Sequence, residues 1–332
     1  MIPALVLTAG LATRLRPLSL VRAKAAMPVA GDVLVRRILR QLYAGGIRDV
    51  VLNLHHLPHT ITREVGDGSD LGLRVRYSWE VPVLGSAGGP RHALPLLAAP
   101  TFLIVNGDTL TDVDIAALVH EHRRTRALVT MAVVPNVETD KYGSVLVDET
   151  GVVTGFAARS TLAPRTIGRT VAPSHPRTLA PFHFVGVQVV DGDAFTSVPP
   201  GTVAESFGAV YPELMRHRAD AVRAYIAAAA FLDIGTPDDY LQTTLRLGGR
   251  NGAALRGKRT DVKPTARVDD SVLWDDVTIE AGVSLRGCIV TDGVCVPAGT
   301  AWTGMMLRQA DGALATGETR VGDLAVAPIH SS

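Results

Sequence analysis

The stretch Ala4-Leu5-Val6-Leu7-Thr8-Ala9-Gly10-Leu11-Ala12-Thr13-Arg14-Leu15, near the start of the chain, decides the fold. Its apolar first part runs directly into a loop of small residues, which predicts a buried strand of a parallel sheet that ends in a glycine turn. Open α/β sheets bind their ligands at the carboxyl ends of such strands. We therefore expect this loop to lie at the mouth of a binding crevice.

The composition of the loop indicates which ligand it binds. Small residues at Ala9, Gly10 and Ala12 let the backbone come close to a ligand, and exposed N–H groups in such a loop attract anions. Arg14 and Lys24 add positive charge. The loop has neither the three glycines of a dinucleotide fingerprint nor the Gly-Lys-Ser/Thr end of a Walker loop. It predicts another kind of phosphate site, with a solvated basic turn as the alternative.

The loop resembles the signature of sugar-nucleotide pyrophosphorylases (nucleotidyltransferases), which runs G-x-G-T-R-L-x-P-L-T followed by P-K. The positions that match are Gly10, Thr13, Arg14, Leu15, Pro17, Leu18 and Lys24. Ala12 replaces the second glycine and Ala23 replaces the proline before the lysine. The resemblance implies that Arg14 and Lys24 act in catalysis, and that nucleotide binds at Ala9, Gly10, Ala12, Thr13 and Arg14.

Length and composition bound the class of protein. The chain has 332 residues, 47% of them hydrophobic, and a net charge of +1. A net charge this close to zero lacks the excess of positive charge that is typical of proteins that bind nucleic acid or an anionic membrane. The two cysteines, Cys288 and Cys295, are too few for a disulfide framework. The sequence contains no stretch of about 20 apolar residues, the length that a membrane-spanning helix needs. We expect a soluble cytoplasmic protein.

The order of segments predicts an α/β catalytic domain over residues 1–249. Helical spacing at 33–42 and 58–65 alternates with apolar strands at 49–54, 73–79 and 101–105. This alternation predicts right-handed crossovers, a mostly parallel sheet and a Rossmann-like three-layer core. Later segments predict a hairpin over 144–156, a strand over 182–190, and helices over 210–217 and 237–247. Residues 159–181 have almost no periodicity and are expected to form a lid or a linker.

The last part of the chain, residues 250–332, has a different pattern. Apolar residues recur about every six positions, namely Val268, Val272, Val277, Val283, Ile289 and Val294. Such hexapeptide periodicity indicates a parallel β-helix, and it resembles the short left-handed β-helix tail of many pyrophosphorylases. A β-rich tail with loosely spaced valines is the alternative. Because a short solenoid has exposed ends, we expect it to be covered by the catalytic domain or by a second subunit of a homo-oligomer.

The segment Glu80-Val81-Pro82-Val83-Leu84-Gly85-Ser86-Ala87-Gly88-Gly89 resembles the family's E-x-x-P-L-G-T-A-G segment, which surrounds the nucleotide base. The resemblance implies that Gly85 and Ser86 bind the nucleotide. An ionised Glu80 can only accept hydrogen bonds, and guanine offers adjacent N–H donors to such a group. The segment therefore favours GTP, with UTP or dTTP as the alternative. A solvated surface glutamate is the other interpretation of Glu80.

Two aspartates are candidates for metal binding. Asp108 ends an apolar strand in Asn106-Gly107-Asp108, where a carboxylate is natural as a Mg²⁺ ligand. Asp233 begins Asp233-Ile234-Gly235-Thr236-Pro237, which matches the family's D-I-G-T-P completely. The resemblance implies that Asp108 and Asp233 hold Mg²⁺ between them and that Gly107 contacts the nucleotide. A turn-forming or helix-capping aspartate is the alternative at each position.

The resemblance also places a sugar-phosphate site. Tyr142, Gly143 and Gly186 fall in segments that shape the sugar pocket in the family. Where the family has F-x-E-K-P, this chain has Phe156-Ala157-Ala158-Arg159-Ser160. Arg159 replaces the lysine as a cation for the sugar phosphate. Ala158 cannot replace the glutamate that holds sugar hydroxyls, which leaves a sugar-like or cyclitol phosphate open.

The expected reaction joins a sugar-1-phosphate, best mannose-1-phosphate, to the α-phosphorus of an NTP, with release of pyrophosphate. UTP or dTTP with glucose-1-phosphate is the alternative substrate pair. A regulatory homologue that binds nucleotide sugar without catalysis is the alternative function, because of the departures at Ala12, Ala23 and Ala158. His55 and His56 are adjacent in an extended segment and point opposite ways, so we expect a structural role rather than a shared metal.

Overall fold

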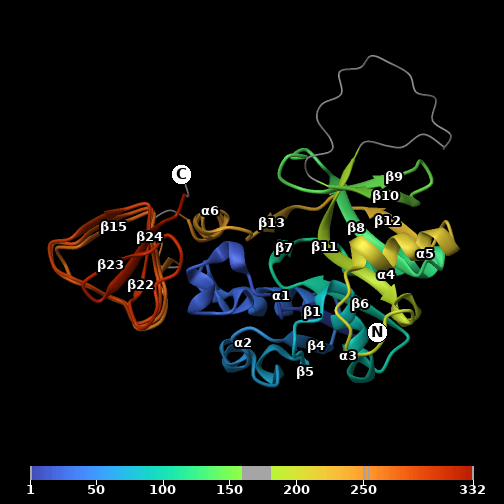
Figure 1. Cartoon of the computed structure of the whole chain (residues 1–332), viewed down its shortest axis with the longest axis horizontal. Helices are drawn as coiled ribbons and strands as arrows, with labels where there is room; N and C mark the ends of the chain where they lie inside the picture. Colours follow the sequence, from blue (N-terminus) through green and yellow to red (C-terminus); the bar gives the residue numbers. More distant parts are fainter. Residues whose placement is uncertain (1, 159–180, 250–251, 253–254, 331–332) are drawn as a thin grey trace, which may run out of the picture. The chain divides into compact units, whose positions relative to one another are not determined.

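The computed structural model describes residues 2–158, 181–249, 252 and 255–330 (Figure 1). The chain forms two compact units. The first consists of Met1–Ala9, Leu39–His55 and Gly66–Phe231, and the second of Gly10–Ile38, His56–Val65 and Leu232–Ser332. The second unit therefore combines the loop at 10–38 with the C-terminal tail. The domain boundary at residue 249 stays a prediction.

The first unit is built on one mixed β-sheet. Its strands are β1 (Ala4–Leu7), β4 (Asp49–Leu54), β5 (Arg74–Trp79), β6 (Thr101–Asn106), β8 (Val129–Pro135), β9 (Ser144–Val147), β10 (Val153–Ala157), β11 (Phe182–Asp191) and β12 (Val222–Ile226). Strands β6, β1, β4 and β5 are neighbours and run parallel. Strand β11 is antiparallel to both β6 and β8. The central strands β1, β4 and β6 consist largely of apolar residues that are buried in the core, as at Leu5, Val51 and Phe102.

Helices pack on this sheet. Helix α3 (Gly85–Leu97) contacts β1 and β4, α4 (Ile115–Thr125) contacts β8 and β11, and α5 (Tyr211–His217) contacts β12. Asp114 caps α4 by accepting a 2.9 Å hydrogen bond from the Ala117 amide. Helix α1 (Leu34–Ala44) belongs partly to each unit. The predicted α/β class is confirmed.

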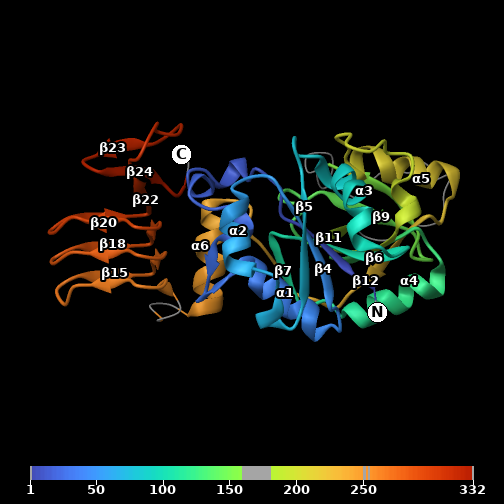
Figure 2. The same cartoon turned by 90° about the horizontal axis from the view of Figure 1, so that it is seen from below.

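The tail forms a left-handed parallel β-helix, as predicted. Its three parallel sheets are β14 (Asp261–Val262), β17 (Thr278–Ile279) and β20 (Cys295–Val296); β15 (Arg267–Asp269), β18 (Ser284–Arg286) and β21 (Ala301–Thr303); and β16 (Val272–Leu273), β19 (Ile289–Val290) and β22 (Met305–Gln309). Figure 2 shows the strands in stacked layers. Residues that pair across coils are separated by 17 positions, as in the bond from Asp275 to Asp292. Leu285, Val290 and Val296 fill the interior, which explains the apolar recurrence in the sequence.

The last coil is covered by the chain itself. Strand β24 (Leu324–Pro328) pairs antiparallel with β22, and β23 (Thr319–Val321) pairs antiparallel with β24. This hairpin occupies the edge of β22 that would otherwise be open to another strand. Arg308, which is buried, donates to the Glu318 carboxylate at 2.6 and 2.7 Å and so joins the hairpin to the coil.

The second unit also contains the short strands β2 (Pro28–Val29) and β3 (Asp32–Val33), and the helices α2 (Pro58–Val65) and α6 (Pro237–Gly248). Helix α6 packs on β2. The buried Tyr240 hydroxyl donates to the Pro28 carbonyl and accepts a 2.8 Å hydrogen bond from Trp274 Nε1. The loop, α6 and the first coil are therefore packed as one body. Among the described residues, no helix is both long and apolar enough to cross a bilayer.

Candidate active site

The signature loop of the second unit is a series of three 3₁₀ turns, Thr13–Leu15, Leu18–Leu20 and Lys24–Ala26. Ala12 precedes the first turn at φ 47° and ψ 46°, the left-handed region that glycine adopts most readily. This conformation explains the glycine in the family signature. The carbonyl of Ala12 accepts a 2.9 Å hydrogen bond from Ser19 Oγ, which holds the turn. Gly10, Thr13 and Arg14 are exposed, as a ligand-binding loop requires.

Arg14 lies beside two carboxylates of the same unit. A β-carbon added at Gly235 would lie 3.0 Å from Asp233 Oδ2, 3.2 Å from Asp239 Oδ2 and 3.5 Å from Arg14 Nη2. The buried Gly235 thus leaves room for three charged side chains around one point. The structure places the predicted Arg14 and Asp233 together, and the absence of a side chain at Gly235 is what permits this approach.

Asp239 is a member of this group that the sequence interpretation did not include. Thr236 is the N-cap of α6, and its hydroxyl accepts from the Asp239 amide at 3.2 Å and donates to Asp239 Oδ2 at 2.9 Å. Thr236 thus caps the helix, and its hydroxyl also holds the Asp239 carboxylate. The Thr-Pro-Asp-Asp order could have indicated the cap. It could not have indicated that the Asp239 carboxylate turns towards Gly235.

Asp108 lies in the first unit, directly after β6. It is partly exposed, and Thr109 Oγ1 donates to its Oδ1 at 3.2 Å. A β-carbon at Gly107 would lie 2.5 Å from the Leu7 carbonyl oxygen, so glycine is needed there for packing against β1. Gly107 therefore has a structural reason to be glycine in addition to its predicted nucleotide contact.

The carboxylates suit a divalent cation by their chemistry. Asp108, Asp233 and Asp239 offer hard oxygen donors of the kind that Mg²⁺ prefers, and Mg²⁺ is usually held by one or two carboxylates together with phosphate oxygens and water. No group of three or more His, Cys, Asp or Glu side chains within the described ranges could by itself enclose a metal ion. Asp108 and Asp233 belong to different units. Their joint binding of the ion stays a prediction.

Glu80 is buried, with 1% of its surface exposed. Its Oε1 accepts from Asn53 Nδ2 and its Oε2 accepts from the Leu84 amide, both at 2.8 Å. Asn53 Oδ1 in turn accepts from the amides of Thr8 and Ala9 at 2.6 and 3.3 Å. Each carboxylate oxygen thus accepts a hydrogen bond from the protein, and the burial is contrary to the solvated alternative. The contact of Glu80 with guanine stays a prediction. Glu80 connects the end of β1 to the 80–84 turn through Asn53.

The segment expected to surround the base forms the turn before α3 and the first turn of that helix, which begins at Gly85. At φ 79°, Gly85 leaves no room for a side chain, since a β-carbon would lie 2.6 Å from the Ala204 carbonyl oxygen. That carbonyl accepts from the amides of Ala87 and Gly88 at 2.9 and 3.3 Å. The small residues of this segment therefore accommodate the neighbouring chain at 202–206.

Ser86 contacts the same neighbouring chain. Its hydroxyl donates to Glu205 Oε2 at 2.6 Å and accepts from the Ser206 amide at 2.9 Å. The Ser206 hydroxyl donates to the Ser86 carbonyl at 2.7 Å. Pro90, four residues further along α3, has no N–H for that carbonyl, so Ser206 replaces the missing helical hydrogen bond. Ser86 is thus occupied by protein partners in the described conformation.

The predicted sugar-site residues of the first unit lie at an aromatic cluster. The Tyr142 ring is 4.2 Å from the His183 ring and 5.4 Å from the Phe231 ring, centroid to centroid. Burial lowers the pKa of His183 to about 4, which keeps the imidazole neutral near pH 7. His183 was missed at the level of sequence, since a single histidine in a strand carries no signal.

Glycines accompany this cluster. Gly186 adopts φ 81°, and a β-carbon there would lie 3.1 Å from Asn106 Cβ, so the chain passes close to the end of β6. At Gly143 a β-carbon would lie 3.2 Å from the Ala157 carbonyl oxygen. Arg159 lies outside the described residues. Its predicted contact with a sugar phosphate stays a prediction.

His55 and His56 each contact a backbone carbonyl, as expected for structural residues. His55 Nδ1 is 2.8 Å from the Glu80 carbonyl oxygen, and His56 Nε2 is 2.7 Å from the Ser19 carbonyl oxygen. The first contact lies within the first unit and the second within the second unit. His56 thus helps to fix the signature loop at the turn that follows Arg14.

Comparison with known proteins agrees with this geometry. The sequence pattern of the family described as nucleotidyl transferase matches residues 3–248, and that of the GlmU-like C-terminal hexapeptide family matches residues 247–309. A mannose-1-phosphate guanylyltransferase of Mycobacterium tuberculosis is 31% identical over 309 residues, which cover 90% of this chain and 82% of the relative. A UTP–glucose-1-phosphate uridylyltransferase of Synechocystis is 25% identical, with 88% and 76% covered.

A solved structure supports the fold. HddC from Yersinia pseudotuberculosis matches with a TM-score of 0.61 at 19% identity, over 74% of this chain and 99% of that one. The nucleotidyl transferase pattern covers the signature loop and the Asp233-Ile234-Gly235-Thr236-Pro237 turn, and the hexapeptide pattern covers most of the solenoid. The chain belongs to the nucleotidyl transferase family, as a sugar-phosphate nucleotidyltransferase with a C-terminal hexapeptide β-helix.

Proposed function

We propose that the enzyme transfers a nucleoside monophosphate from GTP to mannose-1-phosphate, which yields GDP-mannose and pyrophosphate. The observation that carries the proposal is the approach of Arg14 to Asp233 and Asp239 around Gly235, which joins a cation of the signature loop to acidic groups suited to a metal. The choice of sugar and base is supported by the relative that covers most of the chain, a mannose-1-phosphate guanylyltransferase.

The chemistry needs charge compensation more than a protein nucleophile. The attacking group is the phosphate oxygen of the sugar phosphate, which already carries negative charge. Two unit charges 4 Å apart repel by about 1 kcal/mol in water and about 4 kcal/mol at an effective dielectric constant of 20. Arg14 and Lys24 would offset this repulsion at the triphosphate. They would also stabilise the charge that develops on the departing pyrophosphate.

Members of this family generally use a divalent metal, and Mg²⁺ is the ion we propose here. Asp108 and Asp233 would hold it, as the family resemblance implies; Asp239 lies beside Asp233. When bound, the ion neutralises triphosphate oxygens and polarises the α-phosphate. Arg14 would orient the triphosphate, Lys24 would bind it as a second cation, and Tyr142 with His183 would form an apolar wall for the sugar.

UTP with glucose-1-phosphate is the second candidate pair. The predicted contact of Glu80 with guanine was the physical reason to prefer GTP, and each of its oxygens already accepts one hydrogen bond, from Asn53 and Leu84. A uridylyltransferase is also among the similar proteins. The two nucleotides therefore have to be tested side by side.

The test is a matrix of purified protein with each of GTP, UTP and dTTP against mannose-1-phosphate and glucose-1-phosphate, with pyrophosphate release as the readout. The proposal expects the largest kcat/KM for GTP with mannose-1-phosphate. A larger value for another pair would overturn the substrates but keep the reaction class. Release with no pair, while nucleotide sugar still binds, would instead support the regulatory homologue. A homo-oligomer and a cytoplasmic location remain predictions.

A further inference from the structure

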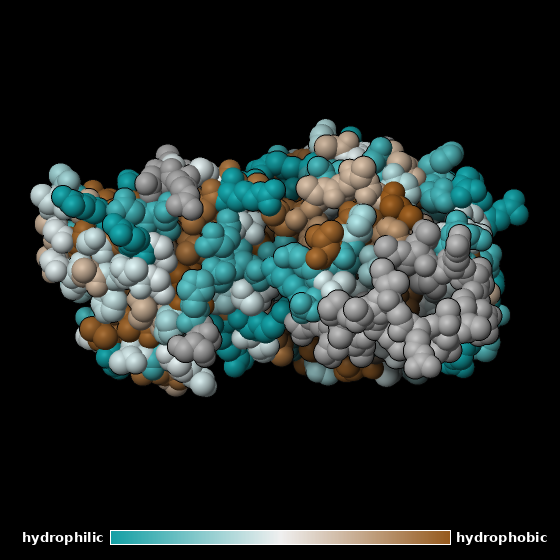
Figure 3. All heavy atoms as spheres, turned by 90° about the horizontal axis from the view of Figure 1, so that it is seen from above, coloured by the Kyte–Doolittle hydropathy of each residue, from teal (hydrophilic) through white to brown (hydrophobic). Residues whose placement is uncertain are grey.

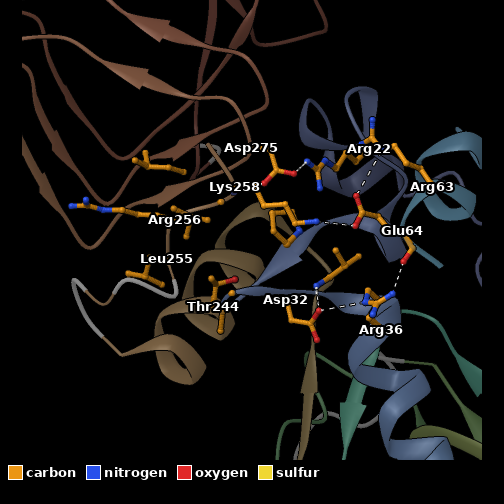
Figure 4. A pocket seen from close by; sticks show the side chains of 17 residues that line it. Arg22, Asp32, Arg36, Arg63, Glu64, Thr244, Leu255, Arg256, Lys258 and Asp275 are labelled. Atoms are coloured by element: carbon orange, nitrogen blue, oxygen red, sulfur yellow. Dashed lines mark hydrogen bonds and ion pairs between the residues drawn. The ribbon is translucent and has the colours of Figure 1, made fainter. Parts of the chain in front are cut away.

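Arg22 is a buried cation in the signature loop, and its partners lie in the β-helix. Its guanidinium is 2% exposed and donates to both oxygens of Asp292, from Nε at 2.6 Å and from Nη2 at 2.7 Å. Nη2 also lies 2.7 Å from Asp275 Oδ2. Figure 4 shows the Arg22 side chain pointing from the signature loop towards Asp275 in the β-helix. The planar guanidinium has thus a two-point match that a lysine could not reproduce.

Contacts within the β-helix orient the two carboxylates that bind Arg22. Asp275 and Asp292 occupy equivalent positions of adjacent coils, and Asp292 Oδ1 accepts from the Asp275 amide at 3.1 Å. Asp275 Oδ1 accepts from the Lys258 amide at 2.7 Å. The Arg22 guanidinium also lies 5.5 Å from the centre of the Trp274 ring. Both carboxylates therefore have fixed orientations, set by the stacking of the coils.

The pKa of Arg22 reflects this arrangement. Burial by itself lowers the pKa, but the hydrogen bonds and negative charges of Asp292 and Asp275 outweigh it and raise the pKa above its ordinary value. The guanidinium therefore stays charged at every accessible pH. Removing one carboxylate would leave a buried charge partly uncompensated, which is costly to the native arrangement.

The other end of this contact is the turn that carries Lys24. Arg22 Nη1 donates to the Ala26 carbonyl at 3.4 Å, and the Ala23 amide donates to Thr60 Oγ1 in α2 at 3.2 Å. The 3₁₀ turn Lys24–Ala26 lies between these two attachments. Its backbone is therefore fixed on both sides of Lys24. A displacement of about 1 Å at a catalytic group can cost about 10²-fold in rate, so such fixing has a direct kinetic value.

We infer that the β-helix takes part in nucleotidyl transfer, because Asp275 and Asp292 hold Arg22 as a positioning residue for Lys24. This inference rests on the proposed function only for the role of Lys24. The β-helix then acts as a part of the catalytic apparatus, and its first two coils are the part required. Loss of the acidic pair should lower turnover without any change in the groups that touch substrate.

The test compares Asp292→Asn with Asp276→Asn in the full-length protein. Asp276 lies in the same coil as Asp275 and pairs with Arg259 on the exposed surface, so its replacement breaks an ion pair of the same coil without touching the loop. We expect Asp292→Asn to lower kcat at least about tenfold with a smaller change in KM, and Asp276→Asn to change kcat less than about twofold. Equal kcat values in the two variants would overturn the inference.

A double-mutant cycle distinguishes positioning from general loss of structure. If Asp292 acts through Lys24, Asp292→Asn should change kcat less than about twofold in a Lys24→Ala background. Multiplicative losses would overturn the inference. Arg22→Lys keeps the charge but loses the two-point match, so its kcat should lie between those of wild type and Asp292→Asn. A loss of kcat no larger than that of Asp276→Asn would also contradict the inference.

Hydrogen exchange supplies a readout that needs no activity. Amides of residues 23–27 should exchange faster in Asp292→Asn than in wild type, while Asp276→Asn should leave them unchanged. Unchanged exchange in Asp292→Asn would overturn the inference even if the substrates proposed above were wrong. Conversely, an inactive wild-type protein with accelerated exchange in Asp292→Asn would reject the proposed function and keep the attachment of the loop to the β-helix.

Discussion

Asn53 donates a 2.8 Å hydrogen bond to Glu80, and both side chains are buried. The Asn53 amide oxygen faces the end of β1 and its nitrogen faces the glutamate, so one side chain joins the start of the signature loop to the turn before α3. Gly89 makes this approach possible, because a β-carbon there would lie 2.7 Å from Glu80 Oε1. The Asn53–Glu80 pair is thus a structural element at the start of the signature loop.

Glu80→Gln should therefore change stability and leave base preference unchanged. One carboxylate acceptor would become an NH₂ donor facing either Asn53 Nδ2 or the Leu84 amide, which leaves a buried donor unsatisfied. We expect the free energy of unfolding, measured with urea, to fall by about 1–3 kcal/mol. The ratio of kcat/KM for GTP to that for UTP should stay within about twofold. A shift of that ratio by an order of magnitude would instead support the contact of Glu80 with the base.

Gly85→Ala should destabilise the protein strongly. The residue adopts a left-handed φ, and its β-carbon would meet the Ala204 carbonyl oxygen at 2.6 Å and Glu205 Oε1 at 2.7 Å. The loss of unfolding free energy should be about 2–3 kcal/mol from strain and displaced chain together. Gly10→Ala is the matched control, since a β-carbon there has no neighbour within 4 Å. Equal stabilities of the two variants would show that α3 and the 202–206 segment pack differently.

Asp233→Asn should abolish most turnover while the protein stays folded. The substitution removes the negative charge beside Arg14 and a candidate metal ligand, so we expect kcat to fall by about 10²–10³. Asp238→Asn, in the first turn of the same α6, is the control and should keep wild-type kcat. EDTA should stop wild-type turnover and added Mg²⁺ should restore it. Near-wild-type turnover of Asp233→Asn at low Mg²⁺ would remove Asp233 from the metal site.

His183 should make the protein sensitive to acid. Its pKa in the folded protein is about 4 and its ordinary value is 6.5, so between these values the unfolded chain binds a proton that the folded chain does not. Stability should therefore fall as pH falls from 6.5 to 4, with no contribution from His183 above that range. His183→Phe keeps a ring against Tyr142 and should flatten the pH dependence of unfolding. Replacement of the exposed His59 should not, and an unchanged slope in His183→Phe would contradict the assignment.

Much of the fold could be predicted because local and global signals agree. The apolar runs of β1, β4 and β6 have no other place than a buried sheet, and α6 begins with a threonine cap, a proline and two acidic residues. The recurrence of apolar residues in the tail corresponds to a real solenoid interior. By contrast, α3 contains Gly88, Gly89, Pro90 and Pro95, which oppose helix formation locally. Tertiary partners such as Ser206 and Ala204 stabilise it, and these are distant in sequence.

Part of the candidate site could be predicted from motifs and charge. Arg14, Lys24 and Asp233 were identified through the family's motifs, and the structure places Arg14 near Asp233. Their roles, like the contact of Glu80 with the base, stay predictions, but the sequence could not show that Glu80 is buried against Asn53 and Leu84. Asn53, Asp239 and Arg22 were missed because their roles depend on partners that the fold brings together. For Arg22 that partner is Asp292, on another coil of the tail.

The 17-residue repeat of the β-helix restricts how the tail can change in length. Asp275 and Asp292 face Arg22 together only because one full coil separates them. An insertion or deletion of a few residues between them would rotate one carboxylate away from the guanidinium, whereas a whole coil added beyond Asp292 would leave the pair aligned. The spacing between Asp275 and Asp292 is therefore fixed at one coil, and the tail can be lengthened only by whole coils added after Asp292.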